Sequence, residues 1–284
     1  MAERAGPEAA LAAWARLLGG KATAKALAGG TEAFPLRVDA PGGRFVLRRY
    51  TGPGAAERAA AALAAAGCAW RVGLGPRPVP TDAGAAWHAE EGQGYVWTLS
   101  RYLAGRPRRR WSGLLPEEAL ALGEALARLH AALRELPPDL AGPAVGGGGE
   151  VRRRGRSDDQ VLHGDPSPGN VLWRAVGGGP ARVAGFVDFD RVDRGPVERD
   201  LARALVGLPP WAGGGGPALA AALLAGYRAG GGRVGGRRLR QGLETALAEG
   251  EAWLAQARLT PAARRSAQRW LARARAVRLT ELSL

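Results

Sequence analysis

The sequence has 284 residues with a single cysteine, Cys68, and its 40 Lys and Arg against 26 Asp and Glu give a formal net charge of +14. A single cysteine excludes a disulfide or a cysteine-based metal site within the chain, which fits a reducing, cytoplasmic setting. The sequence contains neither a signal-like N-terminus nor an apolar run of the ~18 residues that a membrane span needs, so we expect a soluble protein.

The positive charge is spread along the chain rather than gathered in one segment. Its densest runs are Arg108–Arg110 and Arg152–Arg154, and no aromatic residues alternate with the arginines there. A nucleic-acid interface usually gathers basic residues on one face, so we expect neither a nucleic-acid nor a membrane partner. A cationic surface of this kind still favours the approach of an anionic ligand such as a nucleotide.

The first hundred residues are predicted to form a helix followed by two β-hairpins. Apolar residues at helical spacing predict the helix over Pro7–Leu18, and a turn at Gly29–Gly30 precedes the strands. Strand-like runs separated by Gly-containing turns predict the hairpins. Their strands are Phe34–Asp39 with Arg44–Tyr50 and Ala85–Glu90 with Tyr95–Ser100, and an Ala-rich helix, Ala55–Ala66, lies between the two hairpins.

The remainder of the chain is predicted to be mainly helical. Pro116–Leu133 begins with a proline, carries two glutamates in its first turn and places leucines on related faces, so it is the clearest helix. Pro137–Arg156 is Gly- and Arg-rich and predicts a loop. Further helices are expected over residues 217–229, 237–259 and 261–279.

The segment Leu162–Asp190 carries the residues best suited to chemistry. His163-Gly164-Asp165 is followed by Asn170, and two strand-like runs joined by a Gly-rich turn then lead to Asp188-Phe189-Asp190. A hairpin here brings Asn170 and Asp188 together at the ends of adjacent strands. Phosphoryl transfer requires a carboxylate beside the incoming hydroxyl, which Asp165 can supply. Mg²⁺ prefers oxygen ligands, which Asn170 and Asp188 offer.

The order H-G-D-x-x-x-x-N followed by D-F-D resembles the H-x-D-x-x-x-x-N and D-F-G motifs of protein kinases. The Gly in second position and the Pro-Gly before Asn170 resemble the aminoglycoside phosphotransferase and choline kinase family. This resemblance implies an α+β, protein-kinase-like fold of two lobes. We expect a small β-rich nucleotide-binding lobe over residues 1–102 and a larger, mainly helical catalytic and acceptor-binding lobe over residues 103–284.

The resemblance also implies a set of nucleotide-binding residues. Arg48 stands where a kinase has its phosphate-binding Lys, and Glu57 in the following helix is the candidate partner for that cation. Alternatively, Arg48 is a solvated strand residue, and Glu57 is a carboxylate that stabilises the first turn of its helix. Gly29 and Gly30 stand where a turn covers the phosphates, and Leu99 and Arg101 belong to the segment that forms the hinge between the lobes, whose backbone holds the adenine.

Other residues are expected to support the site. His163 is expected to fix the catalytic loop, and Asp200, in the family-like G-P-x-x-x-D-L-A, to brace that loop by accepting backbone hydrogen bonds. Asp200 could alternatively be an ordinary N-terminal helix residue. His130 ends an L-x-x-L-H helix and is expected to be a packed residue. Asp190 is expected to be a solvated residue, with support of the metal ligands as its alternative.

These features predict a Mg²⁺-dependent phosphotransferase that moves the γ-phosphoryl of ATP or GTP to a hydroxyl of a small molecule, with Asp165 as base. The alternative is a catalytically silent kinase-like binding or assembly protein, favoured by Arg48 in the Lys position. A basic nucleic-acid binder is the third class, with affinity that falls steeply with salt. The D-x-D motif of haloacid-dehalogenase-like phosphatases is excluded because it needs a later Lys, and the last Lys is Lys25.

The charge of the last quarter of the chain bears on the acceptor. From Trp211 onward there are twelve Arg and four Glu. A pocket for a polycationic aminoglycoside needs carboxylates to offset the charge of the ligand, and this part of the chain offers few. A neutral or anionic acceptor is therefore the expectation.

Overall fold

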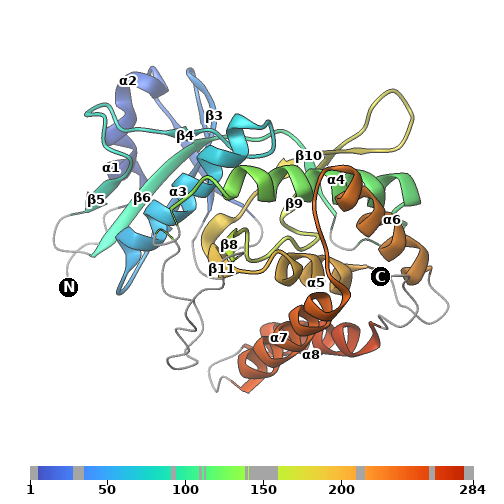
Figure 1. The fold of residues 1–284 in the computed structure, drawn as a ribbon. Coiled ribbons are helices and arrows are strands. Elements are labelled where there is room, and N and C mark those ends of the chain that lie inside the picture. The colour runs from blue at the N-terminus through green and yellow to red at the C-terminus, as the bar shows by residue number, and fades with distance from the viewer. Residues whose placement is uncertain are drawn as a thin grey trace.

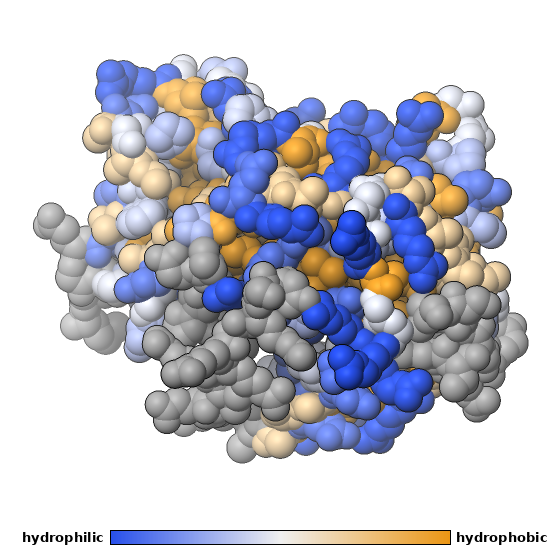
Figure 2. Space-filling view, in the orientation of Figure 1, coloured by the Kyte–Doolittle hydropathy of each residue, from blue (hydrophilic) through white to orange (hydrophobic). Residues whose placement is uncertain are grey.

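The computed structural model describes residues 6–27, 35–90, 94–108, 111, 113–137, 140, 159–208, 215–255 and 260–277. Figure 1 shows an antiparallel sheet at one side of the molecule and helices at the other, with α4 crossing the middle. No helix in the described ranges is long and apolar enough to cross a membrane. On the face drawn in Figure 2, hydrophilic residues are spread over α3, α4 and α7, with apolar residues between them.

The N-terminal part is a six-stranded antiparallel sheet, in which β1, β2, β3, β6 and β4 follow one another and β5 also pairs with β6. Both predicted hairpins are confirmed as β2–β3 and β5–β6. The strand β1 was not predicted. The bounds are β1 Thr23–Ala26, β2 Leu36–Ala40, β3 Gly43–Tyr50, β4 Pro78–Val79, β5 His88–Glu90 and β6 Tyr95–Arg101.

One face of this sheet is covered by the N-terminal segment. The helix predicted over Pro7–Leu18 is divided into α1 (Pro7–Leu11), the 3-10 turn η1 (Ala12–Trp14) and α2 (Ala15–Leu18). The break allows Trp14, which is fully buried, to donate a hydrogen bond from Nε1 to the carbonyl oxygen of Val79 at 3.1 Å. These residues and the inner side chains of β2, β3 and β6 form the smaller of two hydrophobic cores.

The larger core gathers α3 (Ala55–Arg71), α4 (Pro116–Leu133) and the elements that follow. Helices α4 and α6 (Gly216–Ala229) lie side by side. Their approach requires glycine, because a Cβ on Gly123 would overlap the backbone of Leu223 and one on Gly226 would overlap that of Leu120. The remaining helices are α5 (Glu198–Gly207), α7 (Gly236–Ala255) and α8 (Pro261–Ala276).

Two small sheets carry the segment with the predicted chemistry. The hairpin of β9 (Val171–Arg174) and β10 (Arg182–Phe186) is confirmed, and β7 (Arg106–Pro107) adds a strand to it. A second ladder joins β8 (Gln160–Leu162) to β11 (Asp193–Gly195), with Leu162 opposite Asp193. This ladder was not predicted, and it places the chain before His163 beside the chain after Asp190.

Candidate active site

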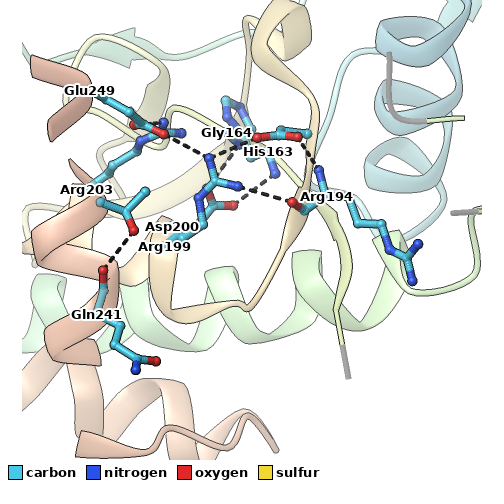
Figure 3. Close-up of polar contacts among 10 residues, drawn as sticks. His163, Gly164, Arg194, Arg199, Asp200, Arg203, Gln241 and Glu249 are labelled. Atoms are coloured by element: carbon cyan, nitrogen blue, oxygen red, sulfur yellow. Dashed lines mark hydrogen bonds and ion pairs between the residues drawn. The ribbon is translucent and has the colours of Figure 1, made fainter. Parts of the chain in front are cut away.

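The loop His163–Asp165 is held by a carboxylate from α5. Asp200 accepts hydrogen bonds from the backbone N–H groups of His163 at 2.9 Å and Gly164 at 3.0 Å, and it is fully buried. Figure 3 shows the carboxylate below this loop. Burial opposes the charge of Asp200, but the hydrogen bond from His130 at 3.1 Å holds its pKa below the usual value. The contacts expected of Asp200 are therefore present, and His130 is a packed residue.

Gly164 has a structural reason to be glycine. Its φ is +84°, in the left-handed region, and a Cβ at this position would overlap the carbonyl oxygen of Arg191. Left-handed backbone disfavours other residues, and the overlap involves backbone, which cannot move aside as a flexible side chain can. The close approach brings the loop that carries Asp165 against the turn that follows Asp188.

His163 links the two loops through both ring nitrogens. The backbone N–H of Asp165 lies 3.2 Å from Nδ1, and Nε2 lies 3.1 Å from the carbonyl oxygen of Val187. Because the first partner is a donor and the second an acceptor, the neutral ring carries its proton on Nε2. Burial lowers the pKa of His163, which favours this neutral form. The ring also packs on Phe189, with centroids 4.6 Å apart, so His163 holds the loop in place.

Asn170 is hydrogen-bonded to Asp165 and lies next to Asp188. Its Nδ2 donates to the carbonyl oxygen of Asp165 at 3.0 Å and to Oδ2 of the same residue at 3.2 Å. The backbone N–H of Val187 donates to the carbonyl oxygen of Asn170 at 2.9 Å. The structure therefore brings together the three residues predicted to carry the reaction. Because the amide nitrogen of Asn170 makes these hydrogen bonds, its amide oxygen is the atom whose chemistry suits a cation.

Asp188 has an uncommon backbone conformation. Its φ of 69° and ψ of 58° are left-handed, and within the described part of the chain it is the one residue other than glycine with a positive φ. Asp tolerates this region better than most residues. An amide oxygen beside a carboxylate is a donor set that suits a hard cation such as Mg²⁺, so Asn170 and Asp188 fit the metal that the sequence predicts.

Arg48 reaches this carboxylate from the sheet. Its Nη1 lies 2.7 Å from Oδ1 of Asp188 and 2.7 Å from Oδ2 of Asp190, and Tyr50 donates from its hydroxyl to Oδ1 of Asp190 at 2.7 Å. The expected partner Glu57 is exposed in the first turn of α3. The prediction that Glu57 holds Arg48 is therefore wrong: the carboxylates that follow β10 take its place.

The prediction that Asp190 is solvated is also wrong. Its side chain is 10% exposed and accepts hydrogen bonds from both Arg48 and Tyr50. Burial, reinforced by the charge of Asp188, raises the pKa of Asp190 to about 6. Burial also opposes the charge of Asp188, but Arg48 holds the pKa of Asp188 below its usual value. Two carboxylates around one guanidinium leave a net negative charge, which favours an added cation.

The alternation of side chains along β3 could have predicted part of the cluster formed by Arg48, Tyr50, Asp188 and Asp190. Side chains two residues apart in a strand share a face, so Arg48 predicts that Tyr50 lies beside it, and Arg49 should lie on the other face. The structure places Arg49 over the rings of Tyr95 and Trp97. Thr98, directly opposite Arg48 in β6, is a buried polar residue on the same face, which the sequence analysis missed.

Two of the predicted nucleotide-binding residues are used by the sheet itself. Leu99 lies opposite Leu47 and is fully buried in the smaller core, so it faces away from Arg48. Arg101 donates from Nη1 to the carbonyl oxygen of Gly42 at 2.7 Å. Both side chains thus contribute to the sheet, and the contact predicted for the backbone of this segment stays a prediction. Gly29 and Gly30 lie outside the described residues.

A cluster next to the loop joins it to the C-terminal helices. Arg199 of α5 lies 2.9 Å from both Asp193 and Glu249, and Arg203 also binds Glu249 (Figure 3). Burial opposes the charge of Glu249, but these two guanidinium groups lower its pKa below the usual value. Helix α7 is thus tied to β11, the strand that follows the Asp188 turn.

Solved structures with a similar fold include small-molecule kinases and phosphotransferases. A microcompartment-associated aminopropanol kinase gives a TM-score of 0.67 at 16% identity, with 94% of each chain covered. A spectinomycin phosphotransferase in complex with ADP and spectinomycin gives 0.60 at 13% identity, covering 93% of this chain and 94% of that one. A choline/ethanolamine kinase family protein from Mesorhizobium loti gives 0.57 at 20% identity, covering 98% and 94%.

These likenesses confirm the α+β, protein-kinase-like fold. The chain matches no curated protein sequence. The model of the phosphotransferase enzyme family matches residues 23–153 and 149–243, which is most of the sequence and includes every residue of the described site except Glu249. The chain therefore belongs to the phosphotransferase enzyme family.

Proposed function

We propose that this protein transfers the γ-phosphoryl group of ATP or GTP to a hydroxyl of a small molecule. The observation that carries the proposal is the constellation of Asp165, Asn170 and Asp188, joined through the hydrogen bonds of Asn170 to Asp165 and of Val187 to Asn170. Family membership supports the reaction class. The similar spectinomycin phosphotransferase, solved with bound ADP, supports a nucleotide as the donor.

Asp165 is the proposed base. Its carboxylate orients the acceptor hydroxyl and takes its proton as the oxygen attacks the γ-phosphorus, while the bond from this phosphorus to the bridging oxygen breaks and the nucleoside diphosphate leaves. Its backbone N–H is bound to His163, and Asn170 donates to one of its carboxylate oxygens, so the side chain is held by the loop. This arrangement restricts the directions in which the carboxylate can point, which is how positioning contributes to such a reaction.

Asn170 and Asp188 are the proposed Mg²⁺ ligands, and Arg48 is proposed to contact the phosphates. When bound, Mg²⁺ neutralises phosphate charge and orients the phosphoryl group for transfer. We also propose that the nucleotide-binding lobe ends near residue 102, and that the adenine or guanine contacts the backbone of the connector beyond β6. That connector, residues 102–105, leads from the smaller hydrophobic core to the larger one.

Thermal unfolding with and without Mg²⁺ and each nucleotide tests the nucleotide site. Ligand at 100 times its Kd stabilises a protein by ~2.7 kcal/mol, so the melting temperature should rise with Mg²⁺ and ATP or GTP. Asp188→Ala should lose the metal-dependent part of this rise. Asp39→Ala, which removes a surface carboxylate of β2, should retain it. A rise that is identical with and without Mg²⁺ would contradict the assignment of Asp188.

Turnover tests the role of Asp165. Once an acceptor is found, Asp165→Ala should lower the rate at least about 100-fold, the low end of the contribution of a positioned base, while nucleotide affinity is largely retained. Unchanged turnover would exclude the mechanism.

The alternative is a silent binding protein. It is favoured by one observation, the hydrogen bond of Arg48 to the metal ligand Asp188. No stabilisation of the wild-type protein by either nucleotide would support this alternative.

A further inference from the structure

We infer that Asp190, held by Tyr50, positions Arg48 for phosphate binding in place of a carboxylate from helix α3. The inference rests on the proposed function, since it assigns a task to Arg48 in that reaction. Asp190 is then a positioning residue that acts through Arg48. This role differs from those proposed for the base, Asp165, and for the metal ligands, Asn170 and Asp188.

The first observation is the burial of the cluster. The side chains of Arg48 and Asp190 are 17% and 10% exposed, and Tyr50 is 4% exposed. A buried charge requires a charged or hydrogen-bonding partner, and Asp190 satisfies this need for Arg48. Its two carboxylate oxygens are divided between the two partners, because Oδ2 accepts from Arg48 and Oδ1 accepts from Tyr50. The orientation of the carboxylate is therefore fixed from both sides.

The second observation concerns two other carboxylates, those of Asp188 and Glu57. Asp188 also accepts from Arg48, but its side chain is 30% exposed, and it is the proposed metal ligand. A carboxylate that binds Mg²⁺ has less negative charge to offer a guanidinium. Glu57 is exposed on α3. Asp190 is the carboxylate that can hold Arg48 whether or not Asp188 is engaged by the metal.

The third observation is how the backbone delivers Asp190. The left-handed conformation of Asp188 begins the 3-10 turn η3 (Phe189–Arg191). Phe189 is buried against His163, and η3 packs on α3, whose neighbouring face is rich in small alanine side chains. Since this turn is fixed by His163 and α3, both carboxylates of D-F-D point at one guanidinium. Helix α3 therefore contributes by supporting the turn rather than by supplying Glu57.

Nucleotide binding by purified full-length variants tests the inference. Isothermal titration with ATP and GTP in Mg²⁺ should show that Asp190→Asn weakens binding of the better nucleotide about 10- to 100-fold, the range that one charge-assisted hydrogen bond supplies. Glu57→Gln should bind like the wild type. Tyr50→Phe, which removes one hydroxyl and keeps the ring, should show a smaller loss in the same direction and provides a second variant should Asp190→Asn not fold.

Two further measurements separate positioning from general damage. The nucleoside of the same nucleotide lacks phosphates, so its affinity should be the same in Asp190→Asn and wild type. Arg48→Met combined with Asp190→Asn should bind no more weakly than Arg48→Met alone, because both changes remove one interaction. Equal loss for nucleoside and nucleotide, additive losses in the double variant, or a loss in Glu57→Gln that matches Asp190→Asn would each overturn the inference.

The same titrations separate the inference from the proposed function. If the wild-type protein binds neither nucleotide with Mg²⁺, the proposed function fails and the role of Asp190 fails with it. If wild type and Asp190→Asn bind the nucleotide equally well, the nucleotide site stands and the inference about Asp190 alone is wrong.

Discussion

At the scale of single residues, glycine and aspartate conformations bring the His163–Asp165 loop and the turn at Asp188 together. Gly164 approaches the carbonyl oxygen of Arg191 with φ at +84°, and Asp188 turns the chain at φ of 69°. Gly164 belongs to the motif His163-Gly164-Asp165, and Asp188 begins the motif Asp188-Phe189-Asp190. The chemistry of these motifs is therefore tied to backbone geometry that few side chains permit.

Gly164→Ala should disrupt this approach. The left-handed conformation costs alanine about 1–2 kcal/mol, and the overlap with backbone adds about 1–3 kcal/mol, so the free energy of unfolding should fall by about 2–5 kcal/mol. Urea denaturation measures it. Gly178→Ala is the matched control, because Gly178 has φ of +77° and nothing within 4 Å of an added Cβ. Equal losses in the two variants would show that the contact with Arg191 contributes nothing.

Sequence reasoning succeeded at this scale where a residue type follows from chemistry. Asp165, Asn170 and Asp188 lie together as predicted, because the prediction relied on the order in which a base and metal ligands follow one another in the chain; their roles stay predictions. The partner of Arg48 was not found, because it depends on where a distant turn places Asp190 in space, 142 residues later in the chain. Position in a family pattern pointed to Glu57, which the structure leaves exposed.

At the scale of elements, Glu118 joins the long helix α4 to the hairpin that carries the site. Its carboxylate accepts two hydrogen bonds from Arg108, at 2.6 and 2.9 Å, and one each from the backbone N–H groups of Leu115 and Ala181. Arg108 also lies over the ring of Trp173 in β9. Burial opposes the charge of Glu118, but these hydrogen bonds hold its pKa below the usual value.

The lowered pKa predicts a pH dependence of stability. A carboxylate with a folded-state pKa below its unfolded value stabilises the fold above the unfolded pKa, here near 4.5, and this contribution is lost as pH falls through the folded pKa. Glu118→Gln should therefore lower the free energy of unfolding at pH 7 by about 1–3 kcal/mol, and the difference from wild type should shrink below about pH 4.5.

Urea denaturation at pH 7 and at successive steps below pH 5 measures this difference. Glu117→Gln, which alters the exposed neighbour in the same helical turn, should change little at any of these pH values. A difference between Glu118→Gln and wild type that stays constant down to the acid limit of folding would show that ionisation of Glu118 is not the cause.

The observed helices and strands show why the sequence predicted some of them and missed others. α4 was predicted with its observed bounds because proline, first-turn glutamates and leucine periodicity agree there. The ladder of β8 and β11 was not predicted, since its strands have three residues each and pair across a long separation in the chain. Such short strands lack a periodic pattern, and their pairing is decided by the loops between them.

At the scale of the whole molecule, charge distribution bears on the acceptor. Two of the four glutamates after Trp211 are already paired within the chain, Glu249 with Arg199 and Arg203, and Glu251 with Arg275. A polycationic ligand would have to compete with these guanidinium groups for the carboxylates. We therefore expect the excess of arginine in this part of the chain to disfavour cationic acceptors and to favour anionic ones.

We therefore expect neutral or anionic hydroxyl compounds to be the acceptors. In a screen that follows nucleotide consumption with Mg²⁺, sugars, amino alcohols and hydroxy acids should include substrates, whereas polycationic aminoglycosides should be turned over at least about tenfold less efficiently, the factor that ~1.4 kcal/mol of unfavourable charge produces. The nucleotide consumption that remains with Asp165→Ala in the same screen does not come from this site and is subtracted. Added salt should reduce the difference in turnover between the neutral or anionic compounds and the aminoglycosides, because screening weakens exposed charge interactions. Efficient turnover of an aminoglycoside would show instead that carboxylates elsewhere in the chain line the acceptor site, and the charge of the C-terminal helices would then have no part in selecting the acceptor.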